Sequence, residues 1–366
     1  MGAKKFMEQA KQAKIVIIGG GVMGCAVAYH LCKEGERDVL LLEKNELTSG
    51  STWHAAGQVT HAVSNYALAK MAAYASTLYP ALEEVTGQSV TWHGCGGLRM
   101  AYTDDEVDWL HYILSVGKGL GLAMEIITPE ASKKLHPFYQ MDGIKAVLHT
   151  PHDGHVDPSG VTFALAKGAR MAGAQIIRHN RATGITRTAN GEFIVHTDTG
   201  DIKAEHVINA GGVYARQIGQ WLGLDLPITN MLHHYLVTEK VAEFSNLEKE
   251  LPVVRDDSQV SGYIRMEQKS GLIGIYEKTN AASVWDDGAP WNGERELFEP
   301  DYERIAPWLE KAMARMPVLY SAGIKRAVHG AITHPPDGNM LIGPQGLEIL
   351  AVLWRSNRYR LGTRRR

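Results

Sequence analysis

The chain has 366 residues, of which 45% are hydrophobic and 21% are charged, and its formal net charge is −2. This composition excludes a disordered or collagen-like chain, and the length predicts two domains or one large one. No apolar run is long enough to cross a bilayer, so we expect no membrane insertion. The polar start has no apolar signal core, and the three cysteines cannot form a disulfide framework, so we expect a cytoplasmic location.

The charge is unevenly distributed along the chain. Residues 355–366 contain six arginines and no acid, so they contribute +6 and the rest of the chain carries −8. An acidic body argues against nucleic acid as a partner. The alternative that this basic end is a nucleic-acid-binding arm is disfavoured because no basic body accompanies it.

In chain order, the first predicted elements form a strand, a helix and a second strand. Residues 15–18 are a β-branched apolar run that predicts a buried parallel strand. Helical spacing of apolar residues follows over 22–33, and 39–42 form a second apolar run. This βαβ unit predicts an α/β fold.

A glycine motif lies between the first strand and the helix. Gly19, Gly21 and Gly24 form G-x-G-x-x-G, in which Gly19 permits the turn and Gly21 allows a pyrophosphate to approach the backbone. Gly24 allows close packing of helix and strand. Glu43 ends the second strand and is placed to accept a ribose hydroxyl, which disfavours NADP but leaves FAD and NAD open.

The next segment, residues 44–57, reads KNELTSGSTWHAAG and is rich in hydroxyl groups. We expect it to lead into a helix and to bind an anionic cofactor, although an N-cap loop also explains the hydroxyls. His54 is by itself typical of a structural histidine. The cofactor-binding positions expected here are Lys44, Thr48, Ser51 and Thr52.

Residues 46–57, ELTSGSTWHAAG, closely resemble the flavin-attachment segment of the dimethylglycine and sarcosine dehydrogenases. Those enzymes are D-amino-acid-oxidase-like, FAD-dependent amine oxidoreductases. The resemblance implies that FAD is the cofactor and that it is linked covalently to a ring nitrogen of His54. Such a link needs a neutral, nucleophilic imidazole.

The resemblance extends over most of the chain. Residues 155–158, His-Val-Asp-Pro, resemble the return of the family's chain to the cofactor domain, and 207–212, VINAGG, resemble its second flavin-proximal glycine motif. A late segment around 337–344 resembles another part of the flavin site. The cofactor-binding positions implied by these segments are Gly211, Gly212, Asp337 and Gly338.

The same resemblance implies a Rossmann-like FAD-binding domain interleaved with a substrate domain built on a largely antiparallel sheet. The expected division assigns 1–60, 151–228 and 323–366 to the FAD-binding domain and 61–150 and 229–322 to the substrate domain.

Two residues of the second predicted domain resemble the family's substrate-facing pair. His233 lies in MLHHYLVT, which is similar to the family's H-Q-Y-V-V-T stretch, and Tyr263 lies in SGYIRME, which is similar to its Y-Y-L-R-Q-E strand. Without the resemblance, cross-strand packing would explain both. An N-methyl amino acid also calls for a carboxylate-binding arginine, for which Arg265 and Arg326 are the candidates.

The resemblance therefore implies FAD-dependent oxidation of an N-methylated glycine, dimethylglycine or sarcosine, to an iminium that releases formaldehyde. Oxygen, an electron-transfer flavoprotein and a quinone route are all open as electron acceptor. Two alternatives stay open: an inactive or apo fragment, and an FAD oxidoreductase for another amino acid. No zinc-protease or nucleophile-elbow motif occurs, so we expect no metal in catalysis.

The end of the chain departs from the family pattern. After Gly346 and Leu347 the family has a glycine-rich stretch, whereas this chain reads EILAVLWRSNRYRLGTRRR. One choice of codons, read one nucleotide out of frame, restores a glycine-containing stretch, so the sequence leads us to expect a C-terminal truncation by frameshift.

Overall fold

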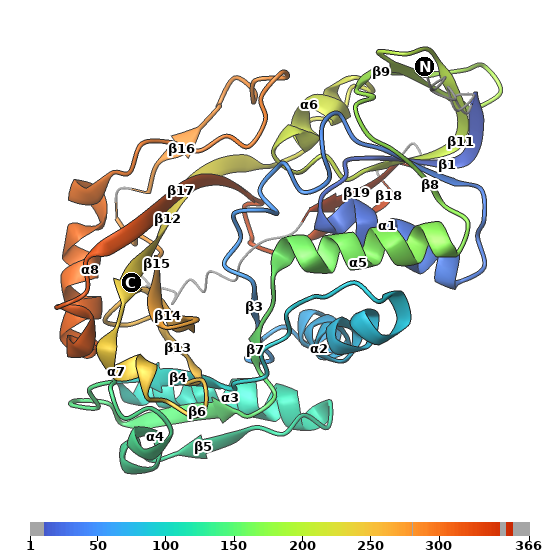
Figure 1. Cartoon of the computed structure of the whole chain (residues 1–366). Coiled ribbons are helices and arrows are strands. Elements are labelled where there is room, and N and C mark those ends of the chain that lie inside the picture. The colour runs from blue at the N-terminus through green and yellow to red at the C-terminus, as the bar shows by residue number, and fades with distance from the viewer. Residues whose placement is uncertain (1–10, 280, 345–348, 354–366) are drawn as a thin grey trace, which may run out of the picture.

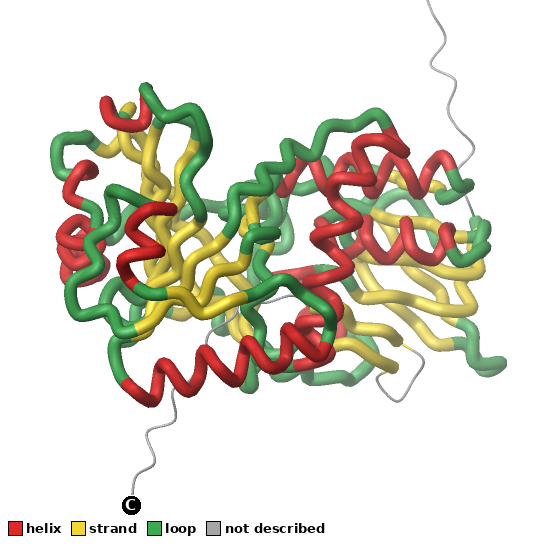
Figure 2. The backbone as a smooth tube through the Cα atoms, turned by 90° about the horizontal axis from the view of Figure 1, so that it is seen from below, coloured by secondary structure: helices red, strands yellow, loops and turns green. Residues whose placement is uncertain are grey.

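The computed structural model describes residues 11–279, 281–344 and 349–353. Two large sheets form separate lobes, as Figures 1 and 2 show, and the chain crosses between them several times. The basic end, residues 355–366, lies outside the described residues, as does most of the segment after Leu347 on which the expected truncation rests. Among the described residues, no helix combines the length and the apolar character needed to span a bilayer.

The first lobe is built on a sheet of eight strands in the order β18-β19-β11-β1-β2-β8, with β10 and β9 added beyond β11. β19, β11, β1, β2 and β8 run parallel to their neighbours, whereas β18, β9 and β10 pair antiparallel. The strands are β1 (Gln12–Ile18), β2 (Val39–Leu42), β8 (Gln175–Ile177), β9 (Ala182–Arg187), β10 (Phe193–Thr197), β11 (Ile202–Asn209), β18 (Leu341–Pro344) and β19 (Ile349–Leu353).

Helices α1 (Val22–Lys33) and α5 (Pro158–Met171) pack against each other on one face of this sheet (Figure 1). α5 begins where Asp157 accepts backbone N–H groups of the first turn and Pro158 fixes the first helical φ. The predicted strand, helix and second strand of the first βαβ unit are confirmed, and the fully buried β2 shows why its sequence does not alternate.

The second lobe is built on a nine-stranded sheet in the order β16-β12-β15-β14-β13-β4-β6-β5, with β17 on the other side of β12. All but one of its pairings are antiparallel, because β13 runs parallel to β4. Its strands are β4 (Gly97–Ala101), β5 (Glu125–Ile127), β6 (Ala146–Thr150), β12 (Thr229–Lys240), β13 (Val253–Asp256), β14 (Gly262–Glu267), β15 (Ser270–Ile275), β16 (Ser283–Val284) and β17 (Ile324–His334).

Helices close the lobes from outside. α8 packs its apolar residues against β15, and α3 begins with a reciprocal capping box between Thr103 and Glu106. The remaining helices are α2 (Tyr66–Thr86), α3 (Asp104–Gly119), α4 (Pro129–Leu135), α6 (Ala215–Gln220), α7 (Ala242–Ser245) and α8 (Tyr302–Arg315), with 3₁₀ turns η1 (Gly212–Tyr214) and η2 (Pro317–Leu319).

The architecture is the expected one, a Rossmann-like lobe interleaved with a largely antiparallel lobe. One boundary differs from the expected division. The expected division places residues 324–334 in the FAD-binding domain. These residues form β17, which pairs with β12 along nearly its whole length in the larger sheet. Local sequence could not show this, because the pairing joins segments about 90 residues apart.

A short two-stranded sheet joins the lobes. β3 (Gln58–Val59) pairs with β7 (Gly154–His155), and both lie between the two large sheets in Figure 1. Gly57 permits this approach, because its φ is +70° and a Cβ there would lie 2.1 Å from the carbonyl oxygen of Val156. The segment that contains His54 therefore leaves the first lobe directly at this junction.

Candidate active site

The glycine turn after β1 packs tightly against the end of β11. Gly19 has a φ of +119°, and a Cβ there would lie 2.3 Å from the carbonyl oxygen of Ala210. At Gly24 a Cβ would lie 1.9 Å from the carbonyl oxygen of Gly19. Gly21 precedes α1 as its N-cap and has no side-chain cap. The turn thus leaves backbone N–H groups at a helix N-terminus, the arrangement that binds phosphate.

Glu43 lies behind this turn at the end of β2. Its Oε2 accepts the N–H of Gly20 at 2.7 Å and its Oε1 accepts the N–H of Asn45 at 2.8 Å. Burial raises the pKa of Glu43 above its ordinary value. Each carboxylate oxygen has a second lone pair, which can accept a ribose hydroxyl.

The hydroxyl-rich segment forms successive turns rather than a helix entry, which corrects the expectation. The next helix, α2, begins only at residue 66, because Thr48 has a φ of 74° and the chain is then drawn toward the other lobe. Thr52 Oγ1 accepts the N–H of Val22, the first residue of α1, at 3.1 Å. Ser51 Oγ donates to the carbonyl of Ala331 at 2.7 Å, which fastens the segment to β17.

The remaining predicted cofactor positions are Lys44 and four late ones, of which Gly211 lies beside the glycine turn, because a Cβ at Gly19 would lie 3.2 Å from its backbone nitrogen. Lys44 Nζ donates to Tyr214 Oη at 3.0 Å and lies over its ring. Gly211 follows β11, and a Cβ there would lie 2.3 Å from Ile218 Cδ1. The remaining three predicted positions are Gly212, which opens η1, and the turn residues Asp337, which is exposed, and Gly338, which has a φ of +74°.

His54 is buried between the two lobes. A Cβ built on Gly330 would lie 2.6 Å from His54 Cε1 and within 3 Å of both ring nitrogens, so the ring lies flat against β17 where a side chain is missing. Burial lowers the pKa of His54 to about 4, so the imidazole is neutral at physiological pH.

His233 lies directly across the strand pair from that same glycine. Strand β12 pairs His233 with Gly330, so His54 and His233 meet at one position of the larger sheet. The His233 ring lies edge-on to Tyr276, with centroids 5.1 Å apart, and Tyr276 lies 5.7 Å from Tyr263. The structure therefore brings together the predicted flavin histidine and both predicted substrate-facing residues.

The tyrosines line the region beside His54. Ala56, Tyr235 and Tyr276 pack on a small apolar cluster that contains Tyr263. Burial raises the pKa of Tyr263 well above its ordinary value, so its hydroxyl stays protonated and can donate a hydrogen bond. Gly274 makes room for the Tyr263 ring, because a Cβ there would overlap it at 1.9 Å.

Behind this site lies a buried polar cluster that the sequence analysis missed. Glu277, which is completely buried, lies 3.4 Å from Nδ1 of His233 and 3.4 Å from Nδ1 of His234. Arg304 Nε lies 3.7 Å from the same carboxylate. Burial alone would raise the pKa of Glu277, but hydrogen bonds from both histidines lower it well below its ordinary value. The only local signal for Glu277 in the sequence is that an acidic residue follows an apolar strand.

The hydrogen bonds also define two histidine tautomers in this cluster. The backbone N–H of Asp301 donates to His234 Nε2 at 3.0 Å, so the proton of His234 lies on Nδ1, toward Glu277. Arg304 donates to His329 Nε2 at 2.7 Å, so the proton of His329 also lies on Nδ1, which donates to the carbonyl of Glu299 at 2.6 Å. The His329 ring stacks on His234 with centroids 3.7 Å apart. The cluster holds β12 and β17 in one arrangement around the site.

The two arginines proposed for carboxylate binding lie in different environments. Arg265 is buried, and its Nη2 lies 2.7 Å from Glu267. Arg326 is exposed on β17 and lines a shallow pocket with Val237. A third arginine, Arg255, lies 4.8 Å from the centroid of the Tyr276 ring. Among the described contacts, neither Arg265 nor Arg326 lies so close to that ring.

Arg255 is oriented by an acidic neighbour. Its Nε donates to Asp257 at 2.6 Å, and Arg99 binds the other oxygen of that carboxylate. Although burial alone would raise it, the charges of Arg255 and Arg99 lower the pKa of Asp257 to about 2. Arg255 was missed because only the pairing of β13 with β14 brings it beside the tyrosines.

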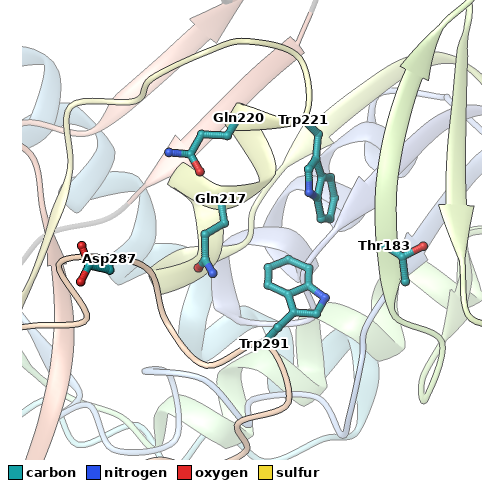
Figure 3. Close-up of a pocket in the computed structure, with 6 residues that line it drawn as sticks. All are labelled: Thr183, Gln217, Gln220, Trp221, Asp287 and Trp291. Atoms are coloured by element: carbon teal, nitrogen blue, oxygen red, sulfur yellow. The ribbon is translucent and has the colours of Figure 1, made fainter.

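A separate open pocket of about 420 Å³ lies at the outer edge of the first lobe (Figure 3). Figure 3 shows Gln217 and Gln220 beside Trp221 and Trp291, with Asp287 beyond the glutamines and Thr183 beyond the tryptophans. None of the predicted site residues lines this pocket, so it is distinct from the region around His54.

The chain is similar to known proteins both in sequence and in fold. Residues 14–359 match the family described as DAO, FAD dependent oxidoreductase. The chain is 41% identical over 341 residues to mitochondrial dimethylglycine dehydrogenase of Rattus norvegicus and 34% identical over 338 residues to mitochondrial sarcosine dehydrogenase of Homo sapiens. The matches cover 92% and 90% of this chain but 40% and 36% of those proteins.

Among solved structures, L-proline dehydrogenase from P. horikoshii superposes with a TM-score of 0.83 and 25% sequence identity. The superposition covers 94% of this chain and 88% of that one. The chain spans about two fifths of the length of the curated relatives it matches. Those relatives are named as mitochondrial, and the expected cytoplasmic location of this chain stays a prediction.

Proposed function

This chain belongs to the DAO family of FAD-dependent oxidoreductases, and on that premise we propose that it oxidises an N-methylated glycine. The substrate is dimethylglycine or sarcosine, which loses a hydride from the N-methyl carbon to become an iminium. Water then adds to the iminium carbon, and formaldehyde and the demethylated amine separate. The observation that supports this proposal most directly is that His54 lies against Gly330, directly opposite His233, whose ring contacts Tyr276.

The residues present fit FAD. The N-terminus of α1, whose N-cap Gly21 has no side chain, forms a cradle for the pyrophosphate and ribose together with the glycine turn and Glu43. A Cβ at Gly19 would collide with the carbonyl oxygen of Ala210, and a Cβ at Gly24 with that of Gly19, so this turn needs glycine at both positions. FAD supplies a two-electron acceptor when bound. His54, neutral and held against β17, would carry it covalently, with the hydroxyls of the preceding turns fixing the segment.

His233 and the tyrosines prepare the amine. The substrate nitrogen must be neutral before hydride leaves, and His233 is placed to accept its proton or a hydrogen bond from it. Glu277 favours a protonated imidazole at His233 and so helps that residue to act as base. The protonated hydroxyl of Tyr263 orients the substrate, and the surrounding rings exclude water and accept the methyl groups.

For the substrate carboxylate we propose Arg255 rather than the two arginines suggested by the sequence. Arg265 is already neutralised by Glu267, and Arg326 is exposed, whereas Arg255 lies over Tyr276 beside the site. Its guanidinium is held beside the tyrosines by Asp257, which accepts from Nε, and a guanidinium in that position can meet a carboxylate. An Arg255→Lys variant is expected to raise KM more than it lowers kcat, because the fork is lost while the charge stays.

The first test is the visible spectrum of the purified protein before and after acid precipitation. Yellow colour that stays in the pellet, and is released in His54→Ala, supports the covalent link. Colour released from the wild type contradicts the link but keeps FAD. A colourless protein that FAD cannot restore supports the inactive-fragment alternative.

The second test is turnover with an artificial electron acceptor and a panel of amines. We expect dimethylglycine or sarcosine to reduce the dye and to yield formaldehyde, with His233→Ala slower by about 10²–10⁴ because a positioned base is lost. Faster turnover of another amino acid, such as proline, without formaldehyde would contradict the proposed substrate and support the alternative oxidoreductase.

A further inference from the structure

A second cluster, of two histidines and one glutamate, lies at the junction of the lobes and takes no part in the proposed oxidation. It consists of His93, which follows α2, His155 on β7, and Glu250, which precedes β13. Each side chain offers one ligand atom, and the three atoms all lie within 4.8 Å of one another. We propose that this cluster, defined here as the junction triad, binds a divalent zinc ion.

The donor set supports zinc. His93 Nδ1 lies 2.7 Å from one oxygen of Glu250, and His155 Nε2 lies 2.5 Å from the other. Without a metal, an N–H of each ring donates to the shared carboxylate. Two imidazoles and one carboxylate are a common protein ligand set for zinc, with water as the fourth ligand. When a cation binds, each neutral ring carries its proton on the other nitrogen, so that His93 Nδ1 and His155 Nε2 can offer lone pairs to the ion and all three side chains stay together.

The backbone holds the two histidines in place before any metal arrives. His93 and His155 form an antiparallel bridge in which each N–H donates to the other residue's carbonyl, at 2.9 and 3.0 Å. Their rings consequently stack, with centroids 4.6 Å apart and planes 8° from parallel. To share one ion the rings must tilt toward each other, and His93 can do so because 42% of its side chain is exposed.

The third ligand, Glu250, is anchored to the segment that follows His93. Three residues after Glu250, the N–H of Val253 donates to the carbonyl of Gly96 at 2.9 Å, and β13 then pairs with β4. Glu250 retains some exposure, so an ion can enter from solvent and keep a water ligand. The ion would therefore tie together three segments that are far apart in the sequence.

The position of the triad gives the ion a structural consequence. His155 also pairs with Gln58 of β3, four residues after His54. Zinc at the triad would stiffen the short sheet through which the His54 segment passes between the lobes. We expect the ion to stabilise the fold without contacting the substrate, so this inference stands or falls separately from the proposed oxidation.

The test uses untagged full-length protein and Zn²⁺ alone, in equilibrium dialysis with metal analysis. We expect one zinc ion per chain in the wild type and at least about a tenfold weaker affinity in His93→Ala and in Glu250→Gln, since loss of a supporting group alone has such an effect at metal sites. His149→Ala is the matched control, because His149 pairs with Glu125 at 3.0 Å outside the triad.

Thermal unfolding provides a second readout that does not depend on activity. Zinc is expected to raise the melting temperature of the wild type and the His149→Ala control, EDTA to reverse the rise, and His93→Ala to show none. Because His93 is partly exposed, this variant is expected to fold. If it does not, Glu250→Gln gives the same comparison. Wild-type protein that binds no more zinc than these variants would overturn the proposal.

Discussion

The two halves of the candidate site are built in different ways. The cofactor cradle comes from one continuous stretch, β1 to Glu43, in which Gly19 and Gly24 lie directly against backbone of the same βαβ unit or at the end of the next strand. The region around Gly330 instead assembles residues from four distant segments through the pairing of β12 with β17. The cradle therefore depends on local conformation, whereas the substrate side depends on register.

This difference predicts how each half fails. In the cradle, a methyl group added at Gly19 or Gly24 meets backbone, which cannot move aside. On the substrate side, the sensitive features are the buried charge of Glu277, which lies beside two histidines, and the absence of a side chain at Gly330. The following variants separate the two kinds of failure.

The largest effect is expected for Gly24→Ala. Its Cβ would lie 1.9 Å from the carbonyl oxygen of Gly19, so α1 must move away from β1. We expect loss of bound FAD and a stability loss of about 3 kcal/mol, at the upper end for overpacking. Chemical denaturation and flavin absorbance measure both, and Gly50→Ala, whose Cβ has open space, is the control. Normal flavin content in Gly24→Ala would contradict the cradle.

The next effect is expected for Glu277→Gln. Removing the carboxylate leaves the surrounding histidines and Arg304 without their buried counter-charge, which costs about 3 kcal/mol. Because the folded pKa of Glu277 lies below its ordinary value of 4.5, its contribution is present above that pH and is lost as pH falls through the lower folded pKa. The variant should show a weaker acid dependence of unfolding below pH 4.5, and an unchanged one would refute this.

An intermediate effect is expected for Gly330→Ala. The added methyl would lie 2.6 Å from the His54 ring, so His54 must leave its place beside β17. We expect a folded protein, destabilised by about 1–2 kcal/mol, whose flavin is released by acid. Gly323→Ala is the control from just before β17, because its nearest neighbour lies 3.7 Å away. Acid-stable flavin in Gly330→Ala would show that the register does not position His54.

The smallest effect at neutral pH is expected for His136, which lies outside both halves and acts on stability only in acid. Burial lowers its pKa to about 4, so at pH 5 it is neutral when folded and protonated when unfolded. Stability therefore rises with pH between about 4 and 6.5, and this residue removes about 2 kcal/mol at pH 5 relative to neutral pH. His136→Phe should flatten this limb of the unfolding curve, and the same slope in wild type and variant would contradict the assignment.

Much of the fold could be predicted from sequence where the pattern is local. The strand at 15–18, the helix at 22–33 and the strand at 39–42 lie where apolar spacing and glycines indicate. The turns at 48–54 could not, since their hydroxyls suit a helix cap equally well. Their path is determined by Ser51, which bonds to a strand 280 residues away.

The candidate site shows the same division. His54, His233 and Tyr263 came from a resemblance to known motifs, and the structure brings them together without any local pattern requiring it. Glu277 and Arg255 carry no motif, because a charged residue at a strand end is common on any surface. The significance of Glu277 comes from its complete burial, and that of Arg255 comes from its position over the Tyr276 ring.

The sequence by itself determined the βαβ unit, its glycine turn and the family of the chain, because turn conformation and apolar periodicity act over neighbouring residues. Only the tertiary structure decided that β17 belongs to the larger sheet, that Gly330 receives the His54 ring, and that Glu277 joins two histidines. These features depend on strand register, which places residues far apart in the chain opposite one another and is invisible to any local pattern.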